Sequence, residues 1–234
     1  MIHKYFRRFI QKFGLDIHKY SPRPDKFYYL QTFGIKTVLD IGANVGQFAK
    51  EIRQVLPEAK IYSFEPIKEC FEQLNENMKT DKNFEAFNFA LGDKNETIKM
   101  NRSSYTPSSS ILEMADAHKK LFPHTKESKP EQIEIRKLDD IINSISLEKE
   151  TLIKVDVQGF EDKVIAGGIE TFKKAKIVLI ENSFIELYEG QPFFDDIYEK
   201  IKSLGFVYKG NLQEKLNKKT GQVISEDSLF IKSS

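Results

Sequence analysis

The chain contains 234 residues, of which 40% are hydrophobic and 30% are charged, with 12 glycines and 8 prolines. This composition is typical of a globular protein and excludes collagen-like and wholly disordered chains. The 36 basic and 35 acidic residues give a net charge of +1, so electrostatics favours no nucleic-acid partner. No uninterrupted apolar run approaches the roughly 18 residues of a membrane-spanning helix.

The cysteine count and the N-terminal residues bear on the compartment. Cys70 is the single cysteine, which excludes an intrachain disulfide and favours a reducing environment. The N-terminus starts with positive charge but lacks the apolar segment of a secretory signal, because Arg7, Arg8 and Lys12 interrupt it. We therefore expect a cytoplasmic protein.

Short apolar and β-branched runs alternate with helical patterns along the chain. Strands are predicted at 37–41, 60–65, 84–91, 151–157, 176–181, 205–209 and 228–232. Apolar residues recur with a helical period in 47–56 and 193–204. This alternation predicts an α/β fold with a doubly wound, Rossmann-like sheet that is mostly parallel. No helical period separates the last two strands, so we expect a C-terminal antiparallel hairpin around a loop at 210–221.

The chain divides into a basic helical extension, 1–35, and a catalytic domain, 36–234. In 1–13, apolar and basic residues fall on opposite faces of a helix. We favour docking of this segment on the domain or on a second subunit; the alternative is peripheral contact with an anionic membrane. Within the domain, 101–132 is rich in Ser, Lys and Pro, and so long an interruption predicts an inserted lid or disorder. The oligomeric state stays open.

A ligand-binding turn is predicted where the first strand passes into the first helix. Gly42 and Gly46 allow a ligand to approach the backbone there, and the helix N-terminus offers unpaired N–H donors. Glu65 ends the second strand about 20 residues later, where an acid accepts hydrogen bonds from ribose hydroxyls. Asp40 would repel a phosphate, and the pattern D-x-G-x-x-x-G lacks the third glycine of the nicotinamide fingerprint.

An acid before the turn suits the ammonium group of a methionine moiety, so these residues favour S-adenosylmethionine as the ligand. Leu91, Gly92 and Asp93 follow the third strand and complete a three-part nucleoside site. The alternative is that the glycines only make tight turns.

Several motifs resemble the FkbM family of methyltransferases over residues 36–232. They are V-L-D-I-G-A-N-V-G-Q at 38–47, F-E-P at 64–66, N-F-A-L-G-D at 88–93, the serines at 108–110, and K-V-D-V-Q-G-F-E at 154–161. The resemblance implies a class I methyltransferase fold, S-adenosylmethionine as the methyl donor, and methylation of a hydroxyl on a sugar or polyketide-like product.

The resemblance also assigns roles to individual residues. The positions that hold the methionine part are matched by Asp40, Gly42, Asn44 and Gly46. Glu65 matches the ribose acid, and the stretch from Leu91 through Gly92 to Asp93 matches the adenine contact. Asp156 matches the position beside the reactive methyl group. The family often has Glu where this chain has Gln158, so a role for a carboxylate there does not transfer.

Methyl transfer to a hydroxyl requires a group that removes the proton. Asp156 is the candidate catalytic base because it ends a strand at the ligand-binding edge of the sheet, and Glu161 is the second candidate. As an alternative, Asp156, Glu181 and Asn182 offer the oxygen ligands that a divalent metal prefers, as in catechol-type O-methyltransferases, so the need for a metal stays open.

We predict an S-adenosylmethionine-dependent O-methyltransferase that modifies a sugar hydroxyl in a glycan or glycosylated metabolite. Segments 101–132 and 210–221 are the candidates for acceptor recognition, because they are loops beside the cofactor platform. His118 and His124, both in the insert, are expected to be solvated rather than catalytic. The alternatives are methylation of a protein or nitrogen acceptor, a non-catalytic nucleoside-binding module and a nicotinamide-dependent reductase.

Overall fold

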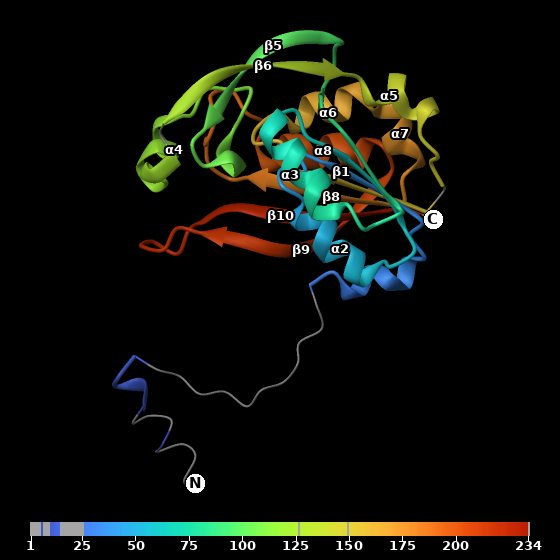
Figure 1. The fold of residues 1–234 in the computed structure, drawn as a ribbon. Coiled ribbons are helices and arrows are strands. Elements are labelled where there is room, and N and C mark those ends of the chain that lie inside the picture. The colour runs from blue at the N-terminus through green and yellow to red at the C-terminus, as the bar shows by residue number, and fades with distance from the viewer. Residues whose placement is uncertain (1–5, 7–9, 15–25, 126, 149, 234) are drawn as a thin grey trace.

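The computed structural model describes residues 6, 10–14, 26–125, 127–148 and 150–233 (Figure 1). Most of the predicted extension 1–35, and with it most of the segment 1–13 expected to dock or to contact a membrane, lies outside these residues. Within the described ranges, no helix is long and apolar enough to cross a membrane.

A seven-stranded sheet forms the centre of the domain, with strand order β3-β2-β1-β7-β8-β10-β9. The parallel strands are β1 (Thr37–Ile41), β2 (Lys60–Phe64), β3 (Phe84–Phe87), β7 (Thr151–Val155) and β8 (Ile177–Ser183). Strands β9 (Phe206–Leu216) and β10 (Val223–Lys232) form the antiparallel hairpin, and β10 pairs antiparallel with β8. The predicted fold class is confirmed.

Helices cover both faces of this sheet. On one face are η1 (Tyr28–Phe33), α2 (Gln47–Val55) and α3 (Lys68–Met78); on the other are α5 (Leu138–Ile141), α6 (Glu161–Gly167), α7 (Ile169–Lys174) and α8 (Phe194–Ser203). Figure 1 shows α2 and α3 in front of the sheet. Every residue of β1 and β7 is buried, because a parallel strand covered on both faces meets no water.

A second, three-stranded sheet changes two of the predicted elements. Its order is β4-β6-β5, with β4 (Ala90–Leu91), β5 (Glu96–Ser103) and β6 (Ser128–Arg136). The single strand predicted at 84–91 is therefore two strands, β3 and β4, in different sheets. The insert 101–132 includes paired residues of β5 and β6, and between them lie η2 (Thr106–Ser108), α4 (Asp116–Leu121) and η3 (Pro123–Thr125).

The hairpin strands are longer than predicted. Residues 210–221, expected to form a loop, belong to β9 up to Leu216, and the connecting turn closes through hydrogen bonds between Asn217 and Gln222 and between Gly221 and Asn217. The expectation of a loop was wrong because β9 is an edge strand. Its polar side chains face solvent, so its sequence lacks the apolar pattern that predicts a strand.

The remaining short element is η4 (Ile142–Ser144), which follows α5 directly.

Candidate active site

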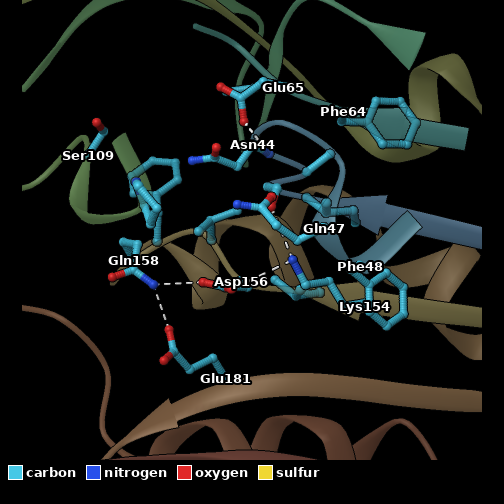
Figure 2. A pocket seen from close by; sticks show the side chains of 18 of the residues that line it. Asn44, Gln47, Phe48, Phe64, Glu65, Ser109, Lys154, Asp156, Gln158 and Glu181 are labelled. Carbon is cyan, nitrogen blue, oxygen red and sulfur yellow. Dashed lines mark hydrogen bonds and ion pairs between the residues drawn. The ribbon is translucent and has the colours of Figure 1, made fainter. Parts of the chain in front are cut away.

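A cavity of about 360 Å³ opens at the carboxyl ends of the parallel strands. It lies between β1 and β7, where the strand order reverses, and this is the place where open α/β sheets bind ligands. Its volume falls within the range of roughly 300–1,000 Å³ of small-molecule sites. In Figure 2, Glu65 lies at one end of the view and Glu181 at the other, with Asn44 and Asp156 between them.

The turn after β1 has the backbone conformation that its glycines permit. Gly42 has φ +80°, and a Cβ atom on it would lie 1.9 Å from the backbone oxygen of Asp156. Gly46 has φ +88°, and Asn44 is a non-glycine residue at φ +48°. Gly42 therefore lets the loops after β1 and β7 approach each other, and Gly42 and Asn44 line the cavity at this point.

Glu65 is buried, with 5% of its surface exposed, and lines the cavity at the end of β2. Its carboxylate accepts the backbone N–H groups of Asn44 and Ile67, each at 2.8 Å. Burial raises the pKa of Glu65 to about 7. Each carboxylate oxygen keeps a lone pair for a further donor. The geometry leaves Glu65 able to accept hydrogen bonds from a bound ribose.

An apolar region lies next to Glu65. Leu91, which was expected to contact the adenine, lines it together with Ile67, Ala90, Met100, Ile111 and Phe160. Gly92 and Asp93 are not among the lining residues. Gly92 instead allows close packing, since a Cβ atom there would lie 3.0 Å from the Phe160 ring, and the Asp93 carboxylate is 4.0 Å from the ammonium of Lys163. Met100 and Ile111 were missed because they belong to β5 and the insert.

Asp40 is fully buried and does not line the cavity. Its Oδ1 atom is 3.4 Å from Nζ of Lys154, and its Oδ2 atom accepts a hydrogen bond from Ser63. Lys154 also donates to the backbone oxygen of Gly42 at 3.0 Å and lies 3.6 Å from Oδ2 of Asp156. Asp40 thus pairs with a lysine that sequence reasoning missed, in place of the expected methionine ammonium group.

The electrostatics of this group follow from burial and charge. Burial raises the pKa of Asp40 despite Lys154. For Asp156, burial acts in the same direction, but the charge of Lys154 and a hydrogen bond from Gln158 outweigh it and hold its pKa below the ordinary value. Lys154 itself keeps a raised pKa because the two carboxylates outweigh its burial. Asp156 is therefore ionised.

Gln158 connects Asp156 to Glu181. Its Nε2 atom donates to Oδ1 of Asp156 at 2.7 Å and to Oε2 of Glu181 at 2.6 Å (Figure 2). Its Oε1 atom accepts the Tyr188 hydroxyl at 3.0 Å, and its backbone has φ +55°. Burial, followed by the charge of Asp156, raises the pKa of Glu181 well above its usual range. Two neighbouring carboxyl groups thus have pKa values displaced in opposite directions.

The serines at 108–110 hold the insert against this loop. Ser110 donates from Oγ to the backbone oxygen of Gln158 at 2.6 Å, and the backbone oxygen of Ser108 accepts the Tyr188 hydroxyl at 3.2 Å. Ser109 lines the cavity. The insert therefore contributes to one wall of the site.

Glu161, the second candidate base, is buried and does not line the cavity. Its carboxylate accepts the backbone N–H groups of Val157 at 3.1 Å and Gly159 at 3.0 Å. It therefore fixes the loop that carries Gln158. Burial raises its pKa to about 7.

This raised pKa predicts a pH dependence of stability. Folded Glu161 binds a proton more readily than unfolded Glu161, so its contribution to the unfolding free energy falls as pH rises from about 4.5 to about 7. The slope for one group is at most about 1.4 kcal/mol per pH unit. We expect Glu161→Gln to reduce the slope, measured by urea unfolding across this range. Equal slopes for the two proteins would contradict the prediction.

Only two of the three alternative metal ligands are brought together. Asp156 and Glu181 line the cavity, whereas Asn182 does not, because successive residues of a strand point to opposite faces. The Nδ2 atom of Asn182 lies 3.4 Å from the backbone oxygen of Ile180. Among the described residues, no group of three or more His, Cys, Asp or Glu side chains is placed to hold a metal ion. The predicted set of three ligands is therefore not assembled in the cavity.

The two histidines of the insert do not line the cavity. His118 was expected to be solvated but is buried, with Nε2 3.0 Å from Oγ1 of Thr125 and its ring 5.0 Å from the Tyr188 ring. Burial lowers its pKa to about 4. His124 is exposed, as expected.

Comparison with known proteins identifies the family. Residues 40–208 match the Methyltransferase FkbM domain. The chain is 34% identical to 2-O-methyltransferase NoeI of Sinorhizobium fredii, over 73% of this chain and 72% of that protein, and 25% identical to Methyltransferase sdnD of Sordaria araneosa, over 72% and 73%. Precorrin-6y C5,15-methyltransferase of Geobacter metallireducens aligns with a TM-score of 0.46 at 11% identity, over 89% and 86%. The chain belongs to the FkbM family of methyltransferases.

Proposed function

We propose that this enzyme transfers the methyl group of S-adenosylmethionine to a hydroxyl of a sugar in a glycan or glycosylated metabolite. The observation that carries the proposal is a single cavity with a nucleoside-type carboxylate, Glu65, near one end and an ionised carboxylate, Asp156, towards the other. The name of the relative NoeI, a 2-O-methyltransferase, supports transfer to oxygen. The sugar acceptor is inferred from the family resemblance of the sequence.

The lining residues fit the chemical groups of the methyl donor. The apolar residues around Leu91 would hold the adenine, Glu65 would accept the ribose hydroxyls, and the turn containing Gly42 and Asn44 would hold the methionine part. Bound S-adenosylmethionine supplies a methyl group on an already activated sulfur leaving group. The protein must then align the acceptor oxygen with that group and remove a proton.

We assign proton removal to the carboxylate of Asp156. It lines the cavity and is ionised at neutral pH because Lys154 and Gln158 stabilise its charge. Their contacts, at 3.6 Å and 2.7 Å, also fix the orientation of the carboxylate. Glu161 acts indirectly in this proposal, by holding the loop after Asp156.

Glu65→Gln is expected to weaken cofactor binding about tenfold, because the charge-assisted hydrogen bonds to the ribose are lost. Calorimetric titration with S-adenosylhomocysteine measures the effect. Glu72→Gln, on the exposed side of α3, is the matched control and should bind as the wild type does. An affinity for Glu65→Gln within about twofold of wild type would contradict the assignment.

The proposed reaction is tested with methyl-labelled S-adenosylmethionine and three groups of acceptors: glycosides, proteins and small amines. Label recovered as a methyl ether on a sugar oxygen supports the proposal. Label transferred only to protein or to nitrogen would contradict the acceptor class while leaving the methyltransferase assignment intact.

A further inference from the structure

Besides Glu65, Lys154 and Asp156, four charged side chains among the described residues line the cavity, and they come from elements far apart in the sequence. Glu181 comes from β8, Asp227 from β10 and Glu51 from α2, and Lys26 precedes η1. We call these four residues, together with Asp156, the acceptor end. Because the other end carries the nucleoside-type residues, this is the part of the cavity left for the molecule that receives the methyl group.

Glu181 and Asp227 are direct partners in the antiparallel pairing of β8 with β10. Cross-strand partners point to the same face, with Cβ atoms about 4.5–5.5 Å apart, and repulsion between two carboxylates in this arrangement favours the protonated form of one of them. Both side chains line the cavity. The sheet thus presents two carboxyl groups side by side to any molecule bound there.

The lysines of the cavity are already engaged with other groups. Nζ of Lys26 lies 3.4 Å from Glu51 and donates to Gln213 at 2.8 Å. Nζ of Lys154 contacts Asp40 and Asp156. Neither lysine is within ion-pairing distance of the pair on β8 and β10.

The side chains of Glu181 and Asp227 make few hydrogen bonds. Glu181 accepts hydrogen bonds from Gln158 at 2.6 Å and from Ser225 at 3.2 Å. Asp227 makes no side-chain hydrogen bond or ion pair with any residue in the part of the chain that the structure describes. Burial and the charge of Asp156 raise the pKa of Asp227. Its carboxyl group is therefore available to a ligand, and the charges of Lys26 and Lys154 act on it without forming an ion pair.

We propose that Glu181 and Asp227 determine acceptor specificity, selecting a polyhydroxylated acceptor that presents hydroxyl or ammonium donors to them and carries no negative charge. An ionised carboxylate accepts hydrogen bonds from a hydroxyl well and from an ammonium group better, and a protonated carboxyl group, the form that the raised pKa of Glu181 favours, both donates to and accepts from a hydroxyl. An anionic acceptor within a few ångströms of these groups would be repelled, and the lysines that line the cavity among the described residues already contact other carboxylates. This inference rests on the proposed function, since it assigns the acceptor for that same site.

The test uses three matched probes: methyl glucoside, its 2-amino-2-deoxy analogue and methyl glucuronide. Their affinities for the protein loaded with S-adenosylhomocysteine are measured by saturation-transfer NMR titration. We expect the amine to bind most tightly and the glucuronide most weakly, with about a tenfold difference between them. Asp227→Asn should reduce this difference to about threefold or less, because it removes the charge of the Asp227 carboxylate.

Glu214→Gln is the matched control, because Glu214 lies exposed on the same hairpin and does not line the cavity. It should keep the wild-type order of affinities. Equal binding of the three probes, tighter binding of the glucuronide, or no binding of any probe to the loaded protein would overturn the inference. Failure of S-adenosylhomocysteine to bind would instead refute the proposed function, so the two failures are distinguishable.

Discussion

Replacing Lys154 with methionine is expected to lower the free energy of unfolding by about 3–5 kcal/mol, the cost of breaking a buried ion pair by removing one partner. Asp40 lies opposite Lys154 in the β1–β7 register and is fully buried. Its Oδ1 atom accepts no hydrogen bond from any residue that the structure describes, so the ammonium 3.4 Å away is its compensating charge. Methionine keeps most of the volume of the side chain but leaves the carboxylate without a counter-charge.

Urea unfolding of the single variant, compared with the double variant Asp40→Asn with Lys154→Met, measures this effect. The double variant removes both charges and should recover most of the lost stability. If the free energy of unfolding of the single variant is within about 1 kcal/mol of the wild-type value, the Asp40–Lys154 pair contributes no more than an exposed ion pair. That result would contradict the prediction.

Asp156→Asn is expected to reduce the rate of methyl transfer by about 10²–10⁴-fold, the usual contribution of a positioned acid or base. Asparagine keeps the shape of the side chain but cannot take the proton of the acceptor hydroxyl. Because the pKa of Asp156 is held below its ordinary value, the wild-type rate should not depend on ionisation of Asp156 at neutral pH and should fall only in acid.

The rate under saturating donor and acceptor, together with calorimetric binding of S-adenosylhomocysteine, measures this prediction. Cofactor affinity should change by less than about threefold, which separates loss of chemistry from loss of the site. Asp195→Asn, an exposed change on α8, should leave both quantities unaltered. A variant of Asp156 that retains full turnover would remove it from the reaction.

The fold was predictable because its central strands are buried on both faces and so appear as continuous apolar runs. The limits predicted for the first strand coincide with Thr37–Ile41 of β1. Edge elements were harder to predict. Exposed β9 and the strands of the second sheet carry polar side chains, and their pairing depends on partners distant in the sequence.

The site was predictable only in part. Glu65 was assigned to the ribose by its position at the end of a strand, Asn44 was assigned to the methionine part by the family resemblance, and both line the cavity. The pairing of Asp40 with Lys154 was not predictable, because it depends on the register between β1 and β7. These strands are separated by more than a hundred residues. The pairing of Asp227 with Glu181 likewise depends on strand register, whereas the burial of Glu161 beneath its own loop depends on the conformation of that loop.

The central claim is that this cavity binds the methyl donor. Calorimetric titration of the wild-type protein with S-adenosylhomocysteine tests it most directly, and a thermal unfolding curve on the same sample shows that the protein is folded. We predict one site per chain with a dissociation constant in the micromolar range. A folded protein that takes up no S-adenosylhomocysteine would contradict the assignment of Glu65 and the turn after β1 to cofactor binding.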